Sequence, residues 1–379
     1  MNENFFGREK EIDHVWKRIK TGNNLILPSP RRVGKTSFAL RLLQEAENSE
    51  WHTVHVNLEK ISNETDFIDQ FIKALQKLSW WEKSKERGNA ILASFGKLKT
   101  NVNYADVKFQ VEWQAKKKDI YTQLSDLLDH EEPTLIFFDE VTVLLNSIEN
   151  SGKDGKKNVT SFLHWLRDLR ITPGSKIRWI YCSSVGIENF THRLGISKTL
   201  NDFENHELKS YTDEESIKML KTLGDSNELI LTDDISKTVV ARLEYCLPFF
   251  LQLMFKKIQF LVAVDGMVLD DNIVDKAYDT LITESEFNTW IERIEEQYYY
   301  NKQYAFRLLK HICEVKEGVS RSGLVNILVA AKLSPEKADE AVTLMLYMLM
   351  NDGYLMHENG LYRFRSPLLR DFWFNRFLK

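Results

Sequence analysis

The stretch NLILPSPRRVGKTSFALRLL, from Asn24 to Leu43, decides the fold class of this chain. It opens with an apolar run typical of a buried strand and continues through a short loop. It then reaches Gly34-Lys35-Thr36, at the start of a segment whose apolar residues have helical spacing. A strand, a loop and a helix start in this order are the context that a phosphate-binding loop requires, because backbone N–H groups at a helix N-terminus hold phosphate oxygens. We therefore predict an α/β domain that binds a nucleotide at this loop.

The residue types in the loop suit this task. The Lys35 ammonium would neutralise the β and γ phosphates, and the Thr36 hydroxyl would bind Mg²⁺. Ser29 stands where the usual pattern has its first glycine and precedes Pro30, so a positive φ there would be strained and the loop would be shaped differently or bind more weakly. A GKT tripeptide alone also occurs by chance, but the flanking strand and helix favour nucleotide binding. The loop residues predicted to contact nucleotide are Arg31, Arg32, Val33, Gly34, Lys35, Thr36 and Ser37.

A second apolar run, TLIFFDE at residues 134–140, ends in two carboxylates. Asp139 would bind Mg²⁺, and Glu140 would orient and deprotonate a water molecule for attack on the γ-phosphate. The alternative is that both carboxylates only cap the helix that starts at Val141. The phosphate loop upstream favours the catalytic interpretation.

A third apolar run, at residues 177–182, ends in Ser183 and Ser184. If its strand lies between the two strands above, a hydroxyl at its end would contact the γ-phosphate or the attacking water, and we predict Ser184 for this role. A serine turn that merely leaves a strand is the alternative, and the local sequence leaves it open.

Short apolar runs alternate with helical patterns over residues 1–209, which predicts a parallel sheet covered by helices. The expected strands are 24–27, 53–57, 134–138, 177–182 and 203–208. Residues 80–119 interrupt the alternation, and the stretch VNYADVKFQVEW within them suggests a two-stranded insertion.

The remaining chain reads as two further domains. Residues 210–297 carry only helical patterns, at 213–223, 233–245, 248–264 and 271–294, which predicts an all-α lid. Residues 298–379 show helices at 304–314, 321–331 and 335–351, followed by strands at 354–357 and 361–364 around an Asn359-Gly360 turn. Three helices and a hairpin predict a winged helix-turn-helix.

Composition indicates a folded, soluble chain. Of 379 residues, 51 are basic and 55 acidic, so only a local patch could hold nucleic acid or an anionic membrane. Cys182, Cys246 and Cys313 are far apart in apolar sequence, which argues against a disulfide framework or a metal cluster. The N-terminus lacks signal-peptide character, and Lys and Gln residues interrupt the most apolar stretch, 247–264. We predict a cytoplasmic protein with no membrane partner.

The motifs FGRE at residues 6–9, PRRVGKTS, LIFFDE, SSVGIENF, PFFLQ and DGYL…YRFRSPLLRDFW together resemble the prokaryotic ATPase family within the STAND class of AAA-like P-loop NTPases. The resemblance covers nearly the whole chain. It implies an ASCE-type α/β P-loop NTPase fold with parallel sheet order 5-1-4-3-2. It also implies ATP or ADP and Mg²⁺ as ligands.

The resemblance carries over to a few further positions. Phe6, Gly7 and Arg8 match an N-terminal motif near the adenine, although a helix start with an acidic first turn is an equal alternative. Pro248 matches a proline that senses the nucleotide, but Cys246 stands where the family commonly has glycine. Arg193 lies where related ATPases carry an arginine finger for a neighbouring subunit, although a solvated helix arginine accounts for it better.

The third helix of the predicted winged helix is poorly suited to DNA, because Glu336, Asp339 and Glu340 outweigh Lys337 in its first turns. Basic residues do follow, at Arg363, Arg365, Arg370 and Arg376. We therefore predict docking to protein over DNA binding.

The predicted function is a Mg²⁺-dependent ATPase that acts as a switch or assembly platform, with a separately encoded protein partner and a nucleotide-dependent homo-oligomer. Two alternatives are an ATP-dependent DNA-binding factor that uses the winged helix and a regulator that holds nucleotide without hydrolysis.

Overall fold

The computed structural model describes residues 6–29, 32–99, 107–129, 132–183, 186–298 and 301–379. The chain divides into two compact units. The sheet unit comprises Arg8–Pro28 and Thr36–Glu207, and the helical unit comprises Met1–Gly7, Ser29–Lys35 and Leu208–Lys379. The division therefore passes through the phosphate-loop stretch, between Lys35 and Thr36.

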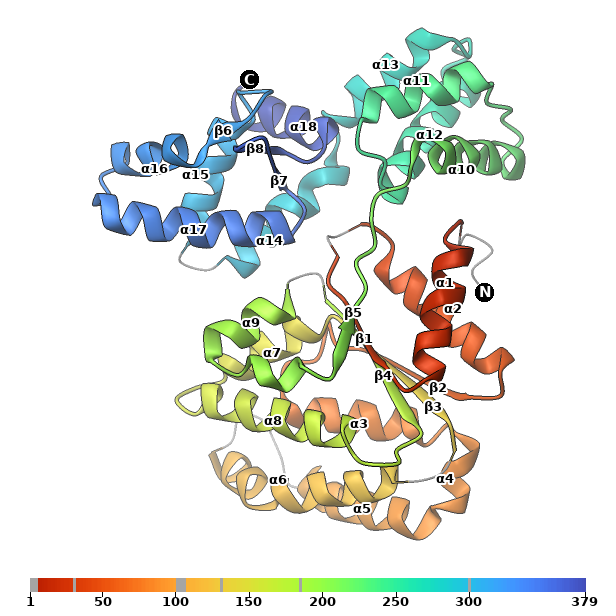
Figure 1. Ribbon diagram of the computed structural model, residues 1–379, viewed down its shortest axis with the longest axis vertical. Helices are drawn as coiled ribbons and strands as arrows, with labels where there is room; N and C mark the ends of the chain where they lie inside the picture. The colour runs from red at the N-terminus through yellow and green to blue at the C-terminus, as the bar shows by residue number, and fades with distance from the viewer. Residues whose placement is uncertain (1–5, 30–31, 100–106, 130–131, 184–185, 299–300) are drawn as a thin grey trace. The chain divides into compact units, whose positions relative to one another are not determined.

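The sheet unit is built on five parallel strands in the order β2-β3-β4-β1-β5 (Figure 1). In the reverse direction, from β5 to β2, this strand order is 5-1-4-3-2, so the predicted order is confirmed. Because the strands are parallel, their carboxyl ends share one edge, where Leu27 lies opposite Cys182 and Asn57 opposite Asp139. The strands are β1 (Asn24–Leu27), β2 (His52–Asn57), β3 (Thr134–Asp139), β4 (Ile177–Cys182) and β5 (Phe203–Asn205), the last ending earlier than predicted.

Aromatic side chains form much of the core beside this sheet. Phe67 and Phe71 of α3 each place their rings 5.3 Å from the ring of Phe138 on β3, edge to face, and Trp179 of β4 lies 5.5 Å from the same ring. Strands buried along their whole length, such as β1 and β3, account for the continuous apolar runs in the sequence. The helices of this unit are α1 (Glu9–Lys20), α2 (Lys35–Asn48), α3 (Glu64–Leu75), α4 (Ser79–Lys83), α5 (Lys85–Lys99), α6 (Val107–Leu128), α7 (Val141–Glu149), α8 (Gly155–Arg170), α9 (Ile187–Leu194) and the 3₁₀ turn η1 (Ser197–Leu200).

The insertion at residues 80–119 is helical wherever the structure describes it, so the two-stranded prediction is wrong. Part of VNYADVKFQVEW, residues 102–106, lies outside the described residues, and the rest forms the start of α6. On α6 the buried residues Trp113, Lys117, Ile120 and Leu124 recur every three or four positions, which is helical spacing. Lys117 Nζ binds Glu64 Oε1 at 2.6 Å, so burial of a lysine on this face is compensated by an ion pair.

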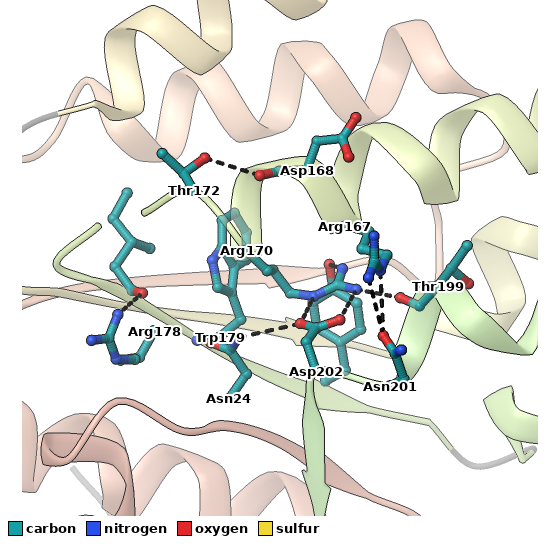
Figure 2. Close-up of polar contacts among 12 residues, drawn as sticks. Asn24, Arg167, Asp168, Arg170, Thr172, Arg178, Trp179, Thr199, Asn201 and Asp202 are labelled. Carbon is teal, nitrogen blue, oxygen red and sulfur yellow. Dashed lines mark hydrogen bonds and ion pairs between the residues drawn. The ribbon is translucent and has the colours of Figure 1, made fainter. Parts of the chain in front are cut away.

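A buried polar cluster closes the amino-terminal edge of the sheet (Figure 2). Arg170, at the end of α8, donates from Nε to Asp202 Oδ2 at 2.7 Å and from Nη2 to Asp202 Oδ1 at 3.0 Å. Asn24 donates to the same Asp202 at 3.3 Å and accepts from the Trp179 backbone N–H at 3.0 Å. The beginnings of β1 and β5 are thereby bound to the last turn of α8.

The helical unit begins with helices, as the sequence predicts. Thr212 and Glu215 form a capping box at the start of α10. The single helix expected at 271–294 is wrong, because the chain leaves the helix after Leu281. The Thr283 hydroxyl donates to the Thr280 carbonyl at 2.8 Å, and the Glu284 carboxylate binds Lys257 at 2.5 Å. The elements here are α10 (Asp213–Ser226), α11 (Asp233–Leu243), α12 (Pro248–Ala263), α13 (Asp271–Leu281), the 3₁₀ turn η2 (Ser285–Phe287) and α14 (Asn288–Gln297).

The last eighty residues combine helices with a three-stranded antiparallel sheet in the order β6-β8-β7. Asn359 and Gly360 both have positive φ, 51° and 79°, as a tight hairpin turn requires. The sequence reasoning did not predict the final helix, α18. The elements are α15 (Lys302–Ile312), β6 (Val319–Ser320), α16 (Arg321–Ala330), α17 (Pro335–Asn351), β7 (Leu355–Glu358), β8 (Leu361–Phe364) and α18 (Pro367–Phe377).

Among the described residues, no helix is long and apolar enough to cross a membrane. Cys182, Cys246 and Cys313 are buried, and none of the three is in a disulfide.

Candidate functional site

The loop after β1 uses Ser29 in a way that the sequence reasoning missed. Left-handed backbone occurs at Arg32 (φ 65°) and Gly34 (φ 96°) and not at Ser29, so the expected strain at the serine is absent. The Ser29 hydroxyl instead accepts a hydrogen bond from the Leu208 backbone N–H at 2.6 Å. Ser29 is almost fully buried, and the bond satisfies a polar group there. Pro30 and Arg31 lie outside the described residues.

Lys35 opens α2 and folds back over its own loop. Its side chain is buried, and Nζ donates to the Ser29 carbonyl at 2.6 Å. A buried ammonium held at the start of a helix places a positive charge where the free N–H groups of the first turn also lie. Of its loop neighbours, Val33 is buried, whereas Arg32, Thr36 and Ser37 are exposed.

Within the sheet unit, Thr36 and Asp139 come together at the carboxyl edge of the sheet. Thr36 Oγ1 donates to Asp139 Oδ2 at 2.9 Å, and the other carboxylate oxygen accepts from the Glu140 backbone N–H at 3.0 Å. Asp139 ends β3 and is 3% exposed. Burial raises the pKa of its carboxyl above the usual value for aspartate, although the Thr36 hydrogen bond opposes this. The predicted pair of metal ligands is therefore adjacent.

These oxygens match what Mg²⁺ takes in nucleotide sites. A hydroxyl and a carboxylate within hydrogen-bonding distance are hard donors, and Mg²⁺ usually combines one or two protein ligands with phosphate oxygens and water. A cation beside Asp139 would also compensate the buried charge. Thr36 and Asp139 are thus the residues that fit this ion.

Glu140 turns the chain sharply between β3 and α7. Its backbone is left-handed, with φ 55° and ψ 42°, a conformation that costs a non-glycine residue about 1–3 kcal/mol. Glu140 is half-buried and directly precedes the first turn of α7. This left-handed residue lets α7 begin directly at the end of β3, one residue after Asp139.

At the neighbouring strand end, Ser183 follows β4 and Thr142 lies in the first turn of α7. Both are buried, and their hydroxyls are hydrogen-bonded to each other. The bond connects the end of β4 to the helix that follows Glu140. The sequence analysis did not predict a role for Thr142. The feature that could have indicated it is a hydroxyl residue placed two positions after Glu140. Ser184, the predicted sensor residue, lies outside the described residues.

The N-terminal motif contributes to both units. Gly7 (φ 68°) and Arg8 (φ 65°) are consecutive left-handed residues. In the helical unit the Tyr211 hydroxyl donates to the Phe6 carbonyl at 2.5 Å, and the two rings lie 6.1 Å apart. In the sheet unit Arg8 caps the start of α1 and binds Glu11 at 2.9 Å.

Arg193 and Pro248, the remaining predicted positions, have clear local roles. Arg193 forms a two-point ion pair with Glu149 at the end of α7, with N–O distances of 2.8 and 2.5 Å. Pro248 is the first residue of α12. A backbone N–H at this position makes no hydrogen bond within the helix, so proline, which has none, is well tolerated there. The next residue, Phe249, contacts Arg32 of the loop.

Comparison with known proteins supports the fold. No known family model matches the chain. A segment of 153 residues is 28% identical to an uncharacterized ATP-binding protein of Methanocaldococcus jannaschii, covering 39% of this chain and 43% of that relative. The Walker-type ATPase PABY2304 of Pyrococcus abyssi is 16% identical with a TM-score of 0.66, covering 98% of this chain and 97% of that one. The Aeropyrum pernix ORC2 protein, solved with ADPNP and ADP, is 14% identical with a TM-score of 0.57, covering 99% and 96%.

The likeness to these two structures and the sheet order define an α/β P-loop NTPase fold with a parallel sheet and a helical C-terminal region.

Proposed function

We propose that this chain binds ATP with Mg²⁺ and hydrolyses it. The observation that carries the proposal is the hydrogen bond of 2.9 Å between Thr36 and Asp139, which puts two oxygen ligands beside each other immediately after the phosphate loop. The ATP-binding name of the Methanocaldococcus relative and the ATPase name of the Pyrococcus neighbour support the choice of nucleotide.

Each residue has a role that its position suggests. Lys35 would leave the Ser29 carbonyl and bind the β and γ phosphates with the backbone N–H groups of residues 31–37. Bound through Thr36 and Asp139, Mg²⁺ would neutralise charge on the phosphate oxygens. Glu140 would accept a proton from the attacking water, and Ser184 would contact that water or the γ-phosphate. Phe6, Gly7 and Arg8 would lie near the adenine.

We further propose that nucleotide state acts on the helical unit as a switch or assembly device of the STAND type. Pro248 is the first residue of α12, and the second, Phe249, contacts Arg32 of the phosphate loop. This contact supports a link between nucleotide state and the helical unit. The partner would be a separately encoded protein, and nucleotide would promote a homo-oligomer. Arg193 could serve a neighbouring subunit only after leaving Glu149, so the proposal does not depend on it.

We assign residues 298–379 to a winged helix-turn-helix that contacts protein, with residues 210–297 as the lid and 1–209 as the ATPase domain. Several arginines that could hold DNA phosphates are engaged inside the domain. Arg363 binds Glu358 at 2.6 Å across the hairpin, Arg370 binds Asp371 at 2.6 Å, and Arg321 binds Asp339 at 2.5 Å. Paired arginines contribute less to a polyanion contact, because each must first leave its carboxylate.

Steady-state phosphate release tests the proposal and its two alternatives. We expect Mg²⁺-dependent release that Lys35→Ala abolishes together with measurable ATP binding, while Lys10→Ala, an exposed lysine of α1, leaves both unchanged. Stimulation by duplex DNA would favour the DNA-binding alternative. Tight ATP binding without release would favour the non-hydrolysing regulator. Unchanged ATP affinity of Lys35→Ala in calorimetry would refute the nucleotide site.

A further inference from the structure

The phosphate loop lies within the helical unit, and its residues Ser29 and Arg32 contact other parts of that unit. At its start, the Ser29 hydroxyl holds the backbone of Leu208, the residue where the chain enters the helical unit after β5. Farther along, the Arg32 guanidinium lies over the ring of Phe249, 4.1 Å from its centroid, and Nη2 donates to Thr289 Oγ1 at 3.3 Å. The loop thus contacts the first turn of α12 and the first turn of α14.

The Arg32 contact continues into the core of the helical unit through aromatic rings. Phe249 lies 5.8 Å from Phe250, and Phe250 lies 6.0 Å from Phe287. Phe287 in turn lies 5.2 Å from Phe372 of α18, and these last three rings are buried. Close-packed interiors transmit strain, so a displacement at Phe249 would act on the rings and helices behind it.

The backbone of Arg32 links this contact to the shape of the loop. Its left-handed φ of 65° is followed two residues later by Gly34 at 96°, and together these turns set the direction of the loop N–H groups. A left-handed non-glycine residue persists when its surroundings hold it, and here the ring and the threonine hold the side chain. The same two contacts occupy the guanidinium that the sequence assigns to phosphate.

We propose that Arg32 is a positioning residue that couples the phosphate loop to α12 and α14, and that it does not bind the nucleotide phosphates. This inference rests on the proposed function, since it concerns the loop that would hold ATP. Rearrangement of the loop around phosphates would pull Arg32 from Phe249, and movement of α12 would change the loop. Phe249 and Arg32 therefore act as one unit in nucleotide binding.

A double-mutant cycle on the full chain separates a positioning residue from a phosphate ligand. ATP affinity would be measured by calorimetry for Arg32→Ala, Phe249→Ala and the double variant. We expect each single change to weaken ATP binding about 5-fold, at the low end of typical coupling between sites, and the double variant to be no weaker than either. Arg41→Ala removes an exposed arginine that bonds within α2, and should match the wild type.

Two further variants and a second measurement distinguish loss of the Arg32–Phe249 contact from loss of charge or of folding. Arg32→Lys keeps the charge but loses the flat guanidinium, so it should behave like Arg32→Ala. Phe249→Leu keeps much of the side-chain volume without the ring face, and replaces Phe249→Ala if that variant unfolds. In hydrogen exchange, ATP should change protection at residues 247–252 and 287–291 of the wild type and of Arg41→Ala. It should not do so in Arg32→Ala.

Several results would overturn the coupling. Arg32 would be assigned to the phosphates or to no role if the losses in the cycle were additive, or if Arg32→Lys kept full affinity for ATP. The same holds if Phe249→Ala and Phe249→Leu kept wild-type affinity, or if the exchange response to ATP were unchanged in Arg32→Ala. Failure of the proposed function has a different signature, namely absence of ATP binding by the unchanged protein, and it would overturn this inference as well.

Discussion

The amino-terminal and carboxyl-terminal ends of the parallel strands, here called the two edges of the sheet, both carry charged side chains. At the first edge the charges form an ion pair, and at the second two carboxylates follow each other in the chain. At the amino-terminal edge, the Arg170 side chain is 0% exposed and donates to Asp202, to the Tyr181 hydroxyl and to the Thr199 carbonyl (Figure 2). At the carboxyl edge, Asp139 is buried and its oxygens accept hydrogen bonds from the Thr36 hydroxyl and the Glu140 backbone N–H, and Glu140 beside it has left-handed backbone.

The difference shows what each edge does for the protein. Buried charges that are paired and hydrogen-bonded hold strands and helices in register. A buried carboxylate whose pKa is raised, next to a left-handed residue, costs stability and is typical of functional sites. The same sheet therefore presents a structural edge and a chemical edge, and substitutions should separate them.

The largest expected effect lies at the chemical edge. Glu140→Gln keeps the side-chain shape and the hydrogen-bonding capacity but removes the base, so ATP turnover should fall about 10²- to 10⁴-fold while ATP binding persists. Single-turnover phosphate release and calorimetry measure the two quantities. Glu86→Gln, at an exposed glutamate of α5, is the control and should change turnover by less than about 3-fold, within ordinary surface effects. Equal losses in both variants would remove Glu140 from the chemistry.

The next effect lies at the structural edge. Arg170→Ala leaves the Asp202 carboxylate, which is 13% exposed, without its ion-pair partner, and the free energy of unfolding should fall by about 3–5 kcal/mol. ATP affinity of the folded fraction should stay the same, because no site residue is touched. Urea unfolding measures the first and calorimetry below the transition the second.

Arg167→Ala is the matched control for this prediction. Arg167 lies on the same helix and donates to the Asn201 side chain at 3.3 and 3.4 Å, but in an exposed setting, so its loss should cost less than about 0.5 kcal/mol. An Arg170→Ala variant that unfolds like the wild type, or that loses ATP binding while fully folded, would contradict the division between the edges.

The chemical edge was the more predictable of the two. Strand β3 and the Asp139-Glu140 pair could be located because a buried parallel strand is a continuous apolar run, and its end is marked by the first charged residues. The loop was recognised in the same way, since strand, glycine, lysine and helix follow each other within a few residues. The sheet order was inferred from resemblance and not from any local pattern.

What could not be predicted depends on residues far apart in the chain. Nothing in the sequence around Arg170 indicates Asp202, and nothing around Glu64 indicates Lys117 on a helix fifty residues later. The insertion was misassigned for the same reason, because its burial pattern is set by the helix it packs against and not by alternation. From the sequence, Ser29 was expected to strain or weaken the loop, because its hydrogen-bond donor, the backbone N–H of Leu208, lies far away in the chain.

The smallest effect concerns the charge of Asp139, and it opposes the usual loss on mutation. Burial raises the pKa of this carboxyl, with a further contribution from Glu140, against the hydrogen bonds from Thr36 and Cys182 and the charge of His55. The native state therefore binds more protons than the unfolded state between the ordinary and the raised pKa. Its contribution to stability falls as pH increases through that interval.

Asp139→Asn removes the charge and keeps a partner for the Thr36 hydroxyl, so without nucleotide it should be more stable than the wild type at pH 7. The gain should disappear below about pH 3.9, the ordinary pKa of aspartate. Each 1 kcal/mol gained would raise Tm by about 2–4 °C. Asp202→Asn, the equivalent change at the structural edge, should instead lower stability, because Arg170 would lose its counter-charge. Thermal unfolding of both variants from pH 3.5 to 8 measures this. A less stable Asp139→Asn at pH 7 would mean that the buried carboxylate is already compensated, and the contrast between the two edges would fail at this residue.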